Sequence, residues 1–440
     1  MKYKSLKISP PQLLIIVFAF FIGLGTLLLK LPFATEKSIP WIDALFTTTS
    51  AMTVTGLSTI DIGTTFTLFG EIVIMCLIQL GGLGIMSFAV LIYLMLGRKI
   101  GIKERLVMQQ ALNQTSLGGI ILLVRNLFIF SFVIEGFAVL LLSFRWIPEF
   151  GFTKGFYYSL FHAISAFNNA GFSLFPNNLM NYVGDPVVNL VLSLLFITGG
   201  IGFTVLIDLR KAKKFRDLSL HSKLMLVSTF VINIVAMMMI FILEFNNPKT
   251  LGLLTGWEQF WATYFQAVSP RTAGFNTIDI SGLEDPTALF MIMLMFIGAG
   301  SASTGGGIKL TTFIIILLAV ISFINGKNKI VVFRRTIHES YVVKALSITM
   351  ISILFVISAI FLMTITEKQP FIVVAFEVMS AFGTTGLSMG LTSNLTEIGK
   401  EIIIFIMFLG KLGPLTLVFS FARRQTEHKI RYPQEDILTG

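Results

Sequence analysis

Four tetrads of small or polar residues, each ending in glycine, are the part of this sequence whose residue types and spacing suggest chemistry. Each tetrad follows an apolar run of about ten residues that is typical of a short helix, and each precedes Leu or Phe. The tetrads are Thr53, Val54, Thr55 and Gly56 (TVTG); Asn168, Asn169, Ala170 and Gly171 (NNAG); Arg271, Thr272, Ala273 and Gly274 (RTAG); and Gly383, Thr384, Thr385 and Gly386 (GTTG).

The chemistry that such segments suggest is the coordination of a dehydrated cation by backbone oxygens. Glycine has no Cβ, so it adopts backbone angles that turn its neighbours' carbonyls towards a common axis. Four such segments around one axis would present rings of carbonyl oxygens that replace the hydration shell of a cation. A single glycine more often only ends a helix. Four glycines at equivalent places in a repeat instead favour a role in an ion selectivity filter.

Composition places the chain in a membrane. Hydrophobic residues make up 55% of the 440 residues, charged residues make up 13%, and the mean hydropathy is +0.85. Several apolar runs reach the roughly 20 residues that cross a bilayer, which excludes an ordinary soluble protein. The one cysteine, Cys76, excludes an intramolecular disulfide framework and suggests a small apolar filler in a helix. The basic start MKYKSLK runs into an apolar segment without a cleavage motif, so we expect that segment to remain as the first span.

The tetrads also define the domain organisation. Their glycines are 115, 103 and 112 residues apart, a period that suits a multi-helix unit repeated four times. We therefore predict an all-α integral membrane protein with four membrane-pore-loop-membrane repeats around a single pore, made of eight transmembrane helices and four pore helices. The predicted units are 1–106, 107–216, 217–332, in which the second helix is broken, and 333–440, which includes a cytoplasmic tail.

The distribution of lysine and arginine predicts the topology. Of 33 such residues, 22 lie in the segments 2–7, 98–105, 210–223, 327–344 and 423–431, which alternate with the tetrads. By the positive-inside rule these segments and both termini are cytoplasmic, and the tetrads open to the outside. This bias explains the net charge of +10 without nucleic-acid binding. The basic surface also suits anionic lipid.

A glycine-rich run interrupts the second long apolar stretch of the third unit, and we interpret it as a mobile gate under the filter. Non-helical backbone at membrane depth must face protein or a cavity. Close packing of helices through small residues is the alternative, and a phosphate-binding loop is excluded by the apolar flanks and incomplete motif. The run comprises Gly298, Ala299, Gly300, Ser301, Ala302, Ser303, Thr304, Gly305, Gly306 and Gly307.

Charged residues inside apolar segments are costly and therefore suggest function. Lys411 lies midway along the last apolar helix, where its cation would form a barrier beside the gate and bond loop carbonyls. Snorkelling to the cytoplasmic face is the alternative. Glu135 is expected to pair with Arg125 or a neighbouring helix in a structural role. Arg271 is expected to pin its loop through Glu258 or Glu377.

These features resemble the ion-translocating subunit of the Trk/Ktr/HKT superfamily of potassium transporters, most closely the bacterial Ktr type, over nearly the whole chain. The resemblance implies K⁺ conduction, a homodimer with one pore per subunit, and control by a cytoplasmic ring of nucleotide-binding RCK-type subunits (KtrA). It assigns gating to the 298–307 run and a pore-facing role to Lys411. It also implies a bacterial plasma membrane location, no covalently bound cofactor, and a nucleotide held by the regulatory subunit. Only one glycine of the TVGYG channel filter remains in each tetrad, so weaker selectivity for K⁺ over Na⁺ is expected.

A membrane-embedded enzyme or a secondary solute carrier is the alternative function. The chain contains four histidines (162, 221, 338 and 428), no HExxH motif and no acidic pair in its apolar spans, so it offers little for catalysis. Secondary carriers more often show inverted repeats with broken helices in both halves. Here the repeat is parallel, and all four tetrads are predicted on one side.

Overall fold

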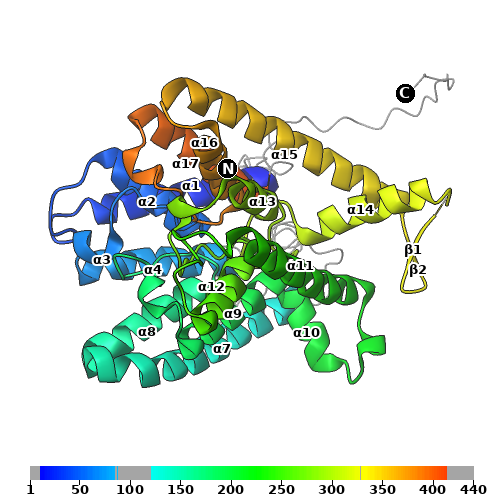
Figure 1. Ribbon diagram of the computed structural model, residues 1–440, viewed down its shortest axis with the longest axis horizontal. Coiled ribbons are helices and arrows are strands. Elements are labelled where there is room, and N and C mark those ends of the chain that lie inside the picture. Colours follow the sequence, from blue (N-terminus) through cyan, green and yellow to red (C-terminus); the bar gives the residue numbers. More distant parts are fainter. Residues whose placement is uncertain (1–9, 85–86, 88–119, 328, 414–440) are drawn as a thin grey trace, which may run out of the picture.

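The computed structural model describes residues 10–84, 87, 120–327 and 329–413, and the same order of elements recurs four times along them. Each unit has a long outer helix, a short pore helix that ends at its tetrad, and an inner helix (Figure 1). The expected all-helical membrane fold is therefore observed. The predicted boundaries between units stay predictions, and the first of them lies outside the described residues.

The bounds of the elements follow this order. The first unit contains α1 (Pro10–Leu29), α2 (Trp41–Thr53), α3 (Ile62–Thr65) and α4 (Leu68–Leu83). The second contains α7 (Ile120–Phe150), α8 (Phe152–Phe167), η1 (Met180–Tyr182), α9 (Pro186–Ile201), α10 (Phe203–Lys211) and η2 (Phe215–Asp217). The third contains α11 (Leu220–Glu244), α12 (Gly256–Val268), η3 (Ile280–Gly282), α13 (Asp285–Phe296) and α14 (Leu310–Ile324).

The fourth unit is preceded by a hairpin of β1 (Ile330–Val332) and β2 (Arg335–Ile337), which are antiparallel and pair Ile330 with Ile337. The unit itself contains α15 (Glu339–Thr366), α16 (Phe371–Gly383), η4 (Thr392–Asn394) and α17 (Glu397–Leu412). The hairpin extends away from the body of the molecule, beyond the end of α14 (Figure 1).

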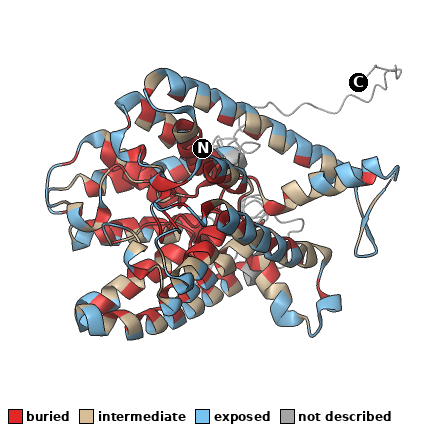
Figure 2. Cartoon of the chain, in the orientation of Figure 1, coloured by how far each residue is buried: buried red, intermediate tan, exposed pale blue. Residues whose placement is uncertain are grey.

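The outer helices are the long spans. Among the described residues, α1, α7, α11 and α15 are long and apolar enough to cross a membrane, and the bent pair α9 and α10 makes a fifth candidate. Their outward faces carry exposed Phe144, Ile242 and Ile365, as expected for surfaces in contact with lipid. Cys76 lies on the exposed face of α4 rather than filling space inside the protein. Buried residues concentrate where the pore helices and tetrads meet (Figure 2).

The inner helix of the second unit is interrupted, which corrects the expectation of a continuous span there. The helices α4, α9 and α17 each end one residue before a glycine with positive φ: Gly84 at 82°, Gly202 at 107° and Gly413 at 83°. After Gly202 the chain turns by 94° into α10. The break in the third unit, after Phe296, therefore has a shorter counterpart in the second unit, whereas most residues after Gly84 and Gly413 lie outside the described part of the chain. Glycine permits these angles because it has no Cβ.

The pore helices form a ring by packing against the inner helix of an adjacent unit. Helix α8 contacts α4, α12 contacts α9, α16 contacts α13, and α2 contacts α17. The last of these contacts joins the first unit to the fourth. One chain therefore closes on itself around a central position that all four pore helices share.

An ion pair reinforces this closure between the first and fourth units. Lys400 Nζ on α17 lies 2.6 Å from Asp43 Oδ1 on α2, and both side chains are largely buried. The Thr59 hydroxyl donates a second hydrogen bond, of 2.8 Å, to the same carboxylate. Removal of one partner from a buried pair leaves an uncompensated charge.

We expect Lys400→Met to destabilise the protein by about 3 kcal/mol because it strands the Asp43 carboxylate in a largely buried site. The thermal midpoint of the purified protein in detergent measures this effect. Lys368→Met is the matched control, because Lys368 is an exposed lysine between α15 and α16. Equal midpoints for the two variants would show that the pair does not hold the ring closed.

Candidate functional site

The four tetrads share one unusual backbone conformation. In each of them the second and fourth residues have positive φ, whereas the third does not. The fourth residues are Gly56 (92°), Gly171 (69°), Gly274 (77°) and Gly386 (94°), and the second residues are Val54 (53°), Asn169 (58°), Thr272 (76°) and Thr384 (49°). Left-handed angles are rare for valine and threonine. Their recurrence at four equivalent positions marks a constrained functional segment.

The tetrads meet one another in a closed ring. A Cβ built on Gly56 would lie 2.3 Å from the Ala170 carbonyl oxygen, and one on Gly171 would lie 2.9 Å from that of Ala273. One on Gly274 would lie 2.0 Å from the Thr385 oxygen, and one on Gly386 would lie 2.3 Å from the Thr55 oxygen. Each contact leads to the next unit, and the fourth returns to the first. Any side chain at these glycines would collide with backbone.

Four serines anchor the ring from behind, and sequence reasoning missed them. The backbone N–H groups of Thr55, Ala170, Ala273 and Thr385 donate to the carbonyl oxygens of Ser50, Ser165, Ser269 and Ser380, at 2.8 to 2.9 Å. The hydroxyls of Ser50 and Ser380 also accept from the N–H groups of the tetrad glycines. The signal was present in the sequence, because a serine occurs at nearly the same offset in every copy of the repeat.

The pore helices contribute to the electrostatics of the site. Helices α2 and α16 end at the first residue of their tetrads, Thr53 and Gly383, α8 ends one residue before its tetrad, and α12 ends three residues before Arg271. The carbonyl end of a helix carries partial negative charge. Four such ends directed at one ring favour a cation there.

The glycine-rich run lies directly against this ring. Its two ends meet at its base, where Gly298 N–H donates to the Ile308 carbonyl over 2.8 Å. The Thr304 hydroxyl donates to Asn169 Oδ1 over 2.7 Å, and Gly306 N–H donates to the Thr384 hydroxyl over 2.9 Å. Asn169 and Thr384 are the second residues of their tetrads, so the run contacts the end of the ring nearest the pore helices.

Neighbouring helices also hold the run. Thr304 N–H and Gly300 N–H donate to the carbonyls of Gly199 and Gly200 on α9, and Gly307 N–H donates to the Gly410 carbonyl on α17. The segment 304–308 is buried. This non-helical backbone is therefore enclosed by protein, which is the condition for such a segment at membrane depth.

Two lysines bond carbonyls of the run. Lys411 Nζ lies 2.5 Å from the Thr304 oxygen, in agreement with the contact expected for it. Lys309 Nζ lies 2.6 Å from the Gly305 oxygen. Lys309 was not predicted from the sequence. It ends the stretch GGGIK (305–309), which was considered only as a candidate phosphate-binding loop. Two cations thus flank adjacent carbonyls beneath the ring.

Glu135 belongs to a buried hydrogen-bond cluster behind the second tetrad. Its carboxylate accepts from Gln79 Nε2 at 3.1 Å and from the Ser131 hydroxyl at 2.9 Å. The tetrad residue Asn168 donates from Nδ2 to Gln79 Oε1 at 2.6 Å and more weakly to Glu135 at 3.4 Å. The expected pairing with a neighbouring helix is observed, whereas Arg125 is exposed and has no ion pair within the described ranges.

The partners expected for Arg271 are wrong. Its Nη1 donates to Asn233 Oδ1 on α11 over 3.2 Å. Glu258 forms a capping box with Thr255, whose backbone and hydroxyl hydrogen bonds lower the pKa of the exposed carboxyl. Glu377 accepts from the hydroxyls of Ser388 and Thr392. Within the described part of the chain, no cluster of three or more His, Cys, Asp or Glu side chains suits a metal.

Comparison with known proteins gives consistent matches along the chain. Residues 11–430 match the TrkH family, described as a cation transport protein. The chain is 57% identical to the Ktr system potassium uptake protein B of Bacillus subtilis, across 99% of this chain and 98% of the relative. It is 42% identical to the protein of the same name from Vibrio alginolyticus, across 100% and 97% of the two chains.

Two further matches extend the comparison. The chain is 38% identical to the potassium/sodium uptake protein NtpJ of Enterococcus hirae, across 99% of this chain and 98% of the relative. The crystal structure of the potassium transporter TrkH from Vibrio parahaemolyticus superposes with a TM-score of 0.74 at 20% identity, covering 96% of this chain and 87% of the other. At that identity the structural match speaks for the fold alone.

Proposed function

Because this chain belongs to the TrkH family of cation transport proteins, we propose that it is the pore-forming subunit of a Ktr-type potassium uptake system. The observation that carries the proposal is the closed ring of four tetrads, in which each glycine abuts a carbonyl of the next unit. A ring of this kind supplies backbone oxygens from four sides to one ion. The relatives named as potassium uptake proteins support the choice of ion.

The proposed mechanism follows from the backbone of the tetrads. Alternation of left-handed and other conformations turns successive carbonyls to the same side of a segment. The oxygens then replace water around K⁺, and the carbonyl ends of the pore helices offset part of the dehydration cost. The relative named as a potassium/sodium uptake protein is a reason to measure Na⁺ as well as K⁺.

The gate proposed for this pore is the 298–307 run with its two lysines. In the observed position the run is bonded to two tetrads and to α9 and α17. Backbone there obstructs the route below the ring, and the cations of Lys309 and Lys411 oppose the passage of another cation. An open state requires the run to leave, so any regulator must favour that displacement.

We further propose a bacterial plasma membrane location, cytoplasmic termini, and assembly as a homodimer with a cytoplasmic ring of nucleotide-binding RCK-type subunits. The alternation of basic segments supports the orientation, and the Ktr-system relatives support the assembly. No cofactor is proposed on this chain. K⁺ is the substrate.

Deletion of Arg431–Gly440 is expected to weaken this assembly, because the tail from Arg423 to Gly440 is a candidate contact for the ring and the second subunit. These residues lie outside the described part of the chain. Sizing chromatography with light scattering measures the mass of the deletion variant alone and with the regulatory subunit. An unchanged dimer mass and unchanged ring binding would contradict the prediction.

The function itself is tested by growth and by flux. The gene should restore growth of a K⁺-uptake-deficient bacterium at low K⁺, together with the genes for its regulatory subunit. The purified protein should carry Rb⁺ into liposomes, and K⁺ should compete. An absence of flux both with and without the regulatory subunit, from protein that elutes as a single folded species, would overturn the proposal.

A further inference from the structure

Arg271 is a buried guanidinium that has no acidic partner among the described residues. Its side chain is 9% exposed, Nη1 bonds only the neutral amide of Asn233, and Nε has no hydrogen-bond partner. None of the ion pairs among the described residues includes it. A buried charge without compensation costs several kcal/mol. The charge also sits at the third tetrad, where it would repel a cation in the ring.

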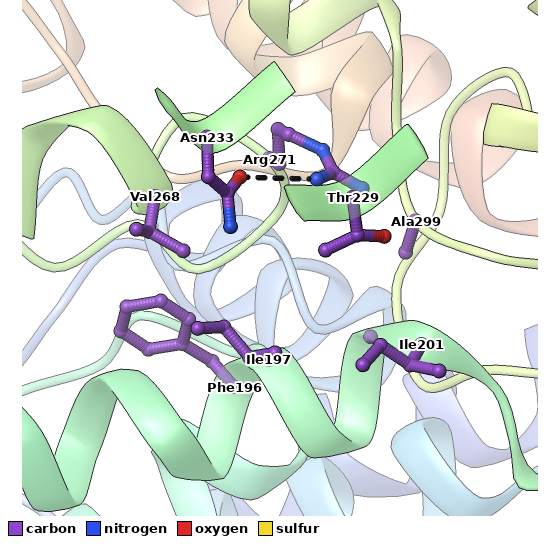
Figure 3. A pocket seen from close by; sticks show the side chains of 9 residues that line it. Phe196, Ile197, Ile201, Thr229, Asn233, Val268, Arg271 and Ala299 are labelled. Carbon is purple, nitrogen blue, oxygen red and sulfur yellow. Dashed lines mark hydrogen bonds between the residues drawn. The ribbon is translucent and has the colours of Figure 1, made fainter. Parts of the chain in front are cut away.

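The guanidinium faces a small pocket between units two and three (Figure 3). The pocket lies between α9, α11, the end of α12 and the start of the glycine-rich run. Its volume of about 20 Å³ accommodates one water-sized particle. The lining residues are Phe196, Ile197, Gly200, Ile201, Thr229, Asn233, Val268, Arg271 and Ala299.

The polar side chains of this pocket offer donors, and none of the described residues that line it is acidic. Thr229 is 7% exposed and its hydroxyl has no hydrogen-bond partner. The oxygen of Asn233 is occupied by Arg271, which leaves its Nδ2 group as a donor that points away from the guanidinium (Figure 3). Arg271 contributes the positive charge. The remaining lining residues are apolar or glycine, so the pocket combines a positive charge and free hydrogen-bond donors with an apolar lining.

We propose that this pocket binds one small monovalent anion of the halide class, such as chloride, as the counter-ion of Arg271. A halide accepts from guanidinium, hydroxyl and amide donors without donating, and its size suits the volume. Because the anion neutralises a positive charge beside the third tetrad, it stabilises the folded protein and the cation-binding ring together.

The first test is thermal stability with the cation and ionic strength held constant. The midpoint of the purified protein should be higher in KCl and KBr than in potassium gluconate, because a ligand that binds only the folded state raises it. Thr229→Val removes one donor at nearly constant volume and should reduce or abolish the halide-dependent shift. Thr349→Val is the control, because the Thr349 hydroxyl is also buried and unpartnered but lies on α15, away from the pocket.

Equal midpoints in chloride and gluconate for the unaltered protein would overturn the proposal. A halide shift that is the same in Thr229→Val and Thr349→Val would also overturn it, because the ion would then bind elsewhere. If Thr229→Val does not fold, anomalous diffraction from bromide-soaked crystals of the unaltered protein tests the proposal instead. An anomalous peak in the pocket supports the proposal, and a water at that position with no anomalous signal refutes it. These readouts do not depend on ion transport, so they stand apart from the proposed function.

Discussion

Removal of Ser301–Gly305 is expected to raise Rb⁺ flux into liposomes by roughly tenfold or more in the absence of the regulatory subunit. The deletion removes the Thr304 contacts with Asn169 and Lys411 and the Gly305 contact with Lys309. Hydrogen bonds to a charged group contribute about 1.5 to 3 kcal/mol each. Their loss therefore shifts the equilibrium between closed and open states towards the open state. The cut joins Gly300 to Gly306, and Gly306 already packs against Gly298, two residues before the new junction.

Single lysine variants separate the electrostatic part of this effect from the steric part. Lys411→Ala and Lys309→Ala each remove one tether and one barrier charge but leave the backbone in place. Their fluxes should lie between those of the intact protein and the loop deletion. Lys327→Ala, at an exposed lysine just after α14, should behave as the intact protein. A correctly folded loop deletion with unchanged or reduced flux would place the gate elsewhere.

Substitution of Gly56 by serine should reduce the preference for K⁺ over Na⁺ by at least about tenfold, or roughly 1.4 kcal/mol of selectivity. A Cβ at this glycine would lie 2.3 Å from the Ala170 carbonyl oxygen, and the positive φ of 92° disfavours any side chain. The ring must therefore widen locally. Oxygens displaced from their spacing compensate less for the dehydration of K⁺, so the advantage of K⁺ over Na⁺ falls.

Competition of Na⁺ and K⁺ against Rb⁺ uptake in liposomes measures this change. Gly136→Ser is the matched control, because a Cβ on that α7 glycine meets no atom within 4 Å. Selectivity identical to that of the unaltered protein in Gly56→Ser would show that the glycine only ends its helix. Loss of flux in both variants would indicate a folding defect rather than a filter effect.

Local repetition made the helical membrane fold and the four tetrads predictable. Each copy carries the same order of apolar helix, serine and tetrad ending in glycine. The four copies therefore support the same structural prediction even where single residues differ. The contact between Lys411 and the glycine-rich run was also foreseen, because a lysine in an apolar helix at membrane depth must find oxygens. These features depend on short stretches of sequence and on the cost of burying polar groups.

Features that depend on packing between units were not predictable. The partner of Arg271 is Asn233 on α11 rather than Glu258 or Glu377, because the identity of the nearest helix follows from the three-dimensional arrangement. The break at Gly202 was not predicted, since a glycine in an apolar helix suits either a packing contact or a break. Lys309 was missed because its target carbonyl belongs to the fold of the loop itself.

The meeting of the two ends of the glycine-rich run, through the bond from Gly298 to the Ile308 carbonyl, has a mechanical consequence. A loop with a closed base can swing without separating α13 from α14 or widening the helical wall. The area that the protein occupies in the bilayer then stays the same in the shut and conducting states. Lateral tension acts only on changes in that area. If the run is the gate, stretching the membrane is therefore expected to leave conduction unaltered.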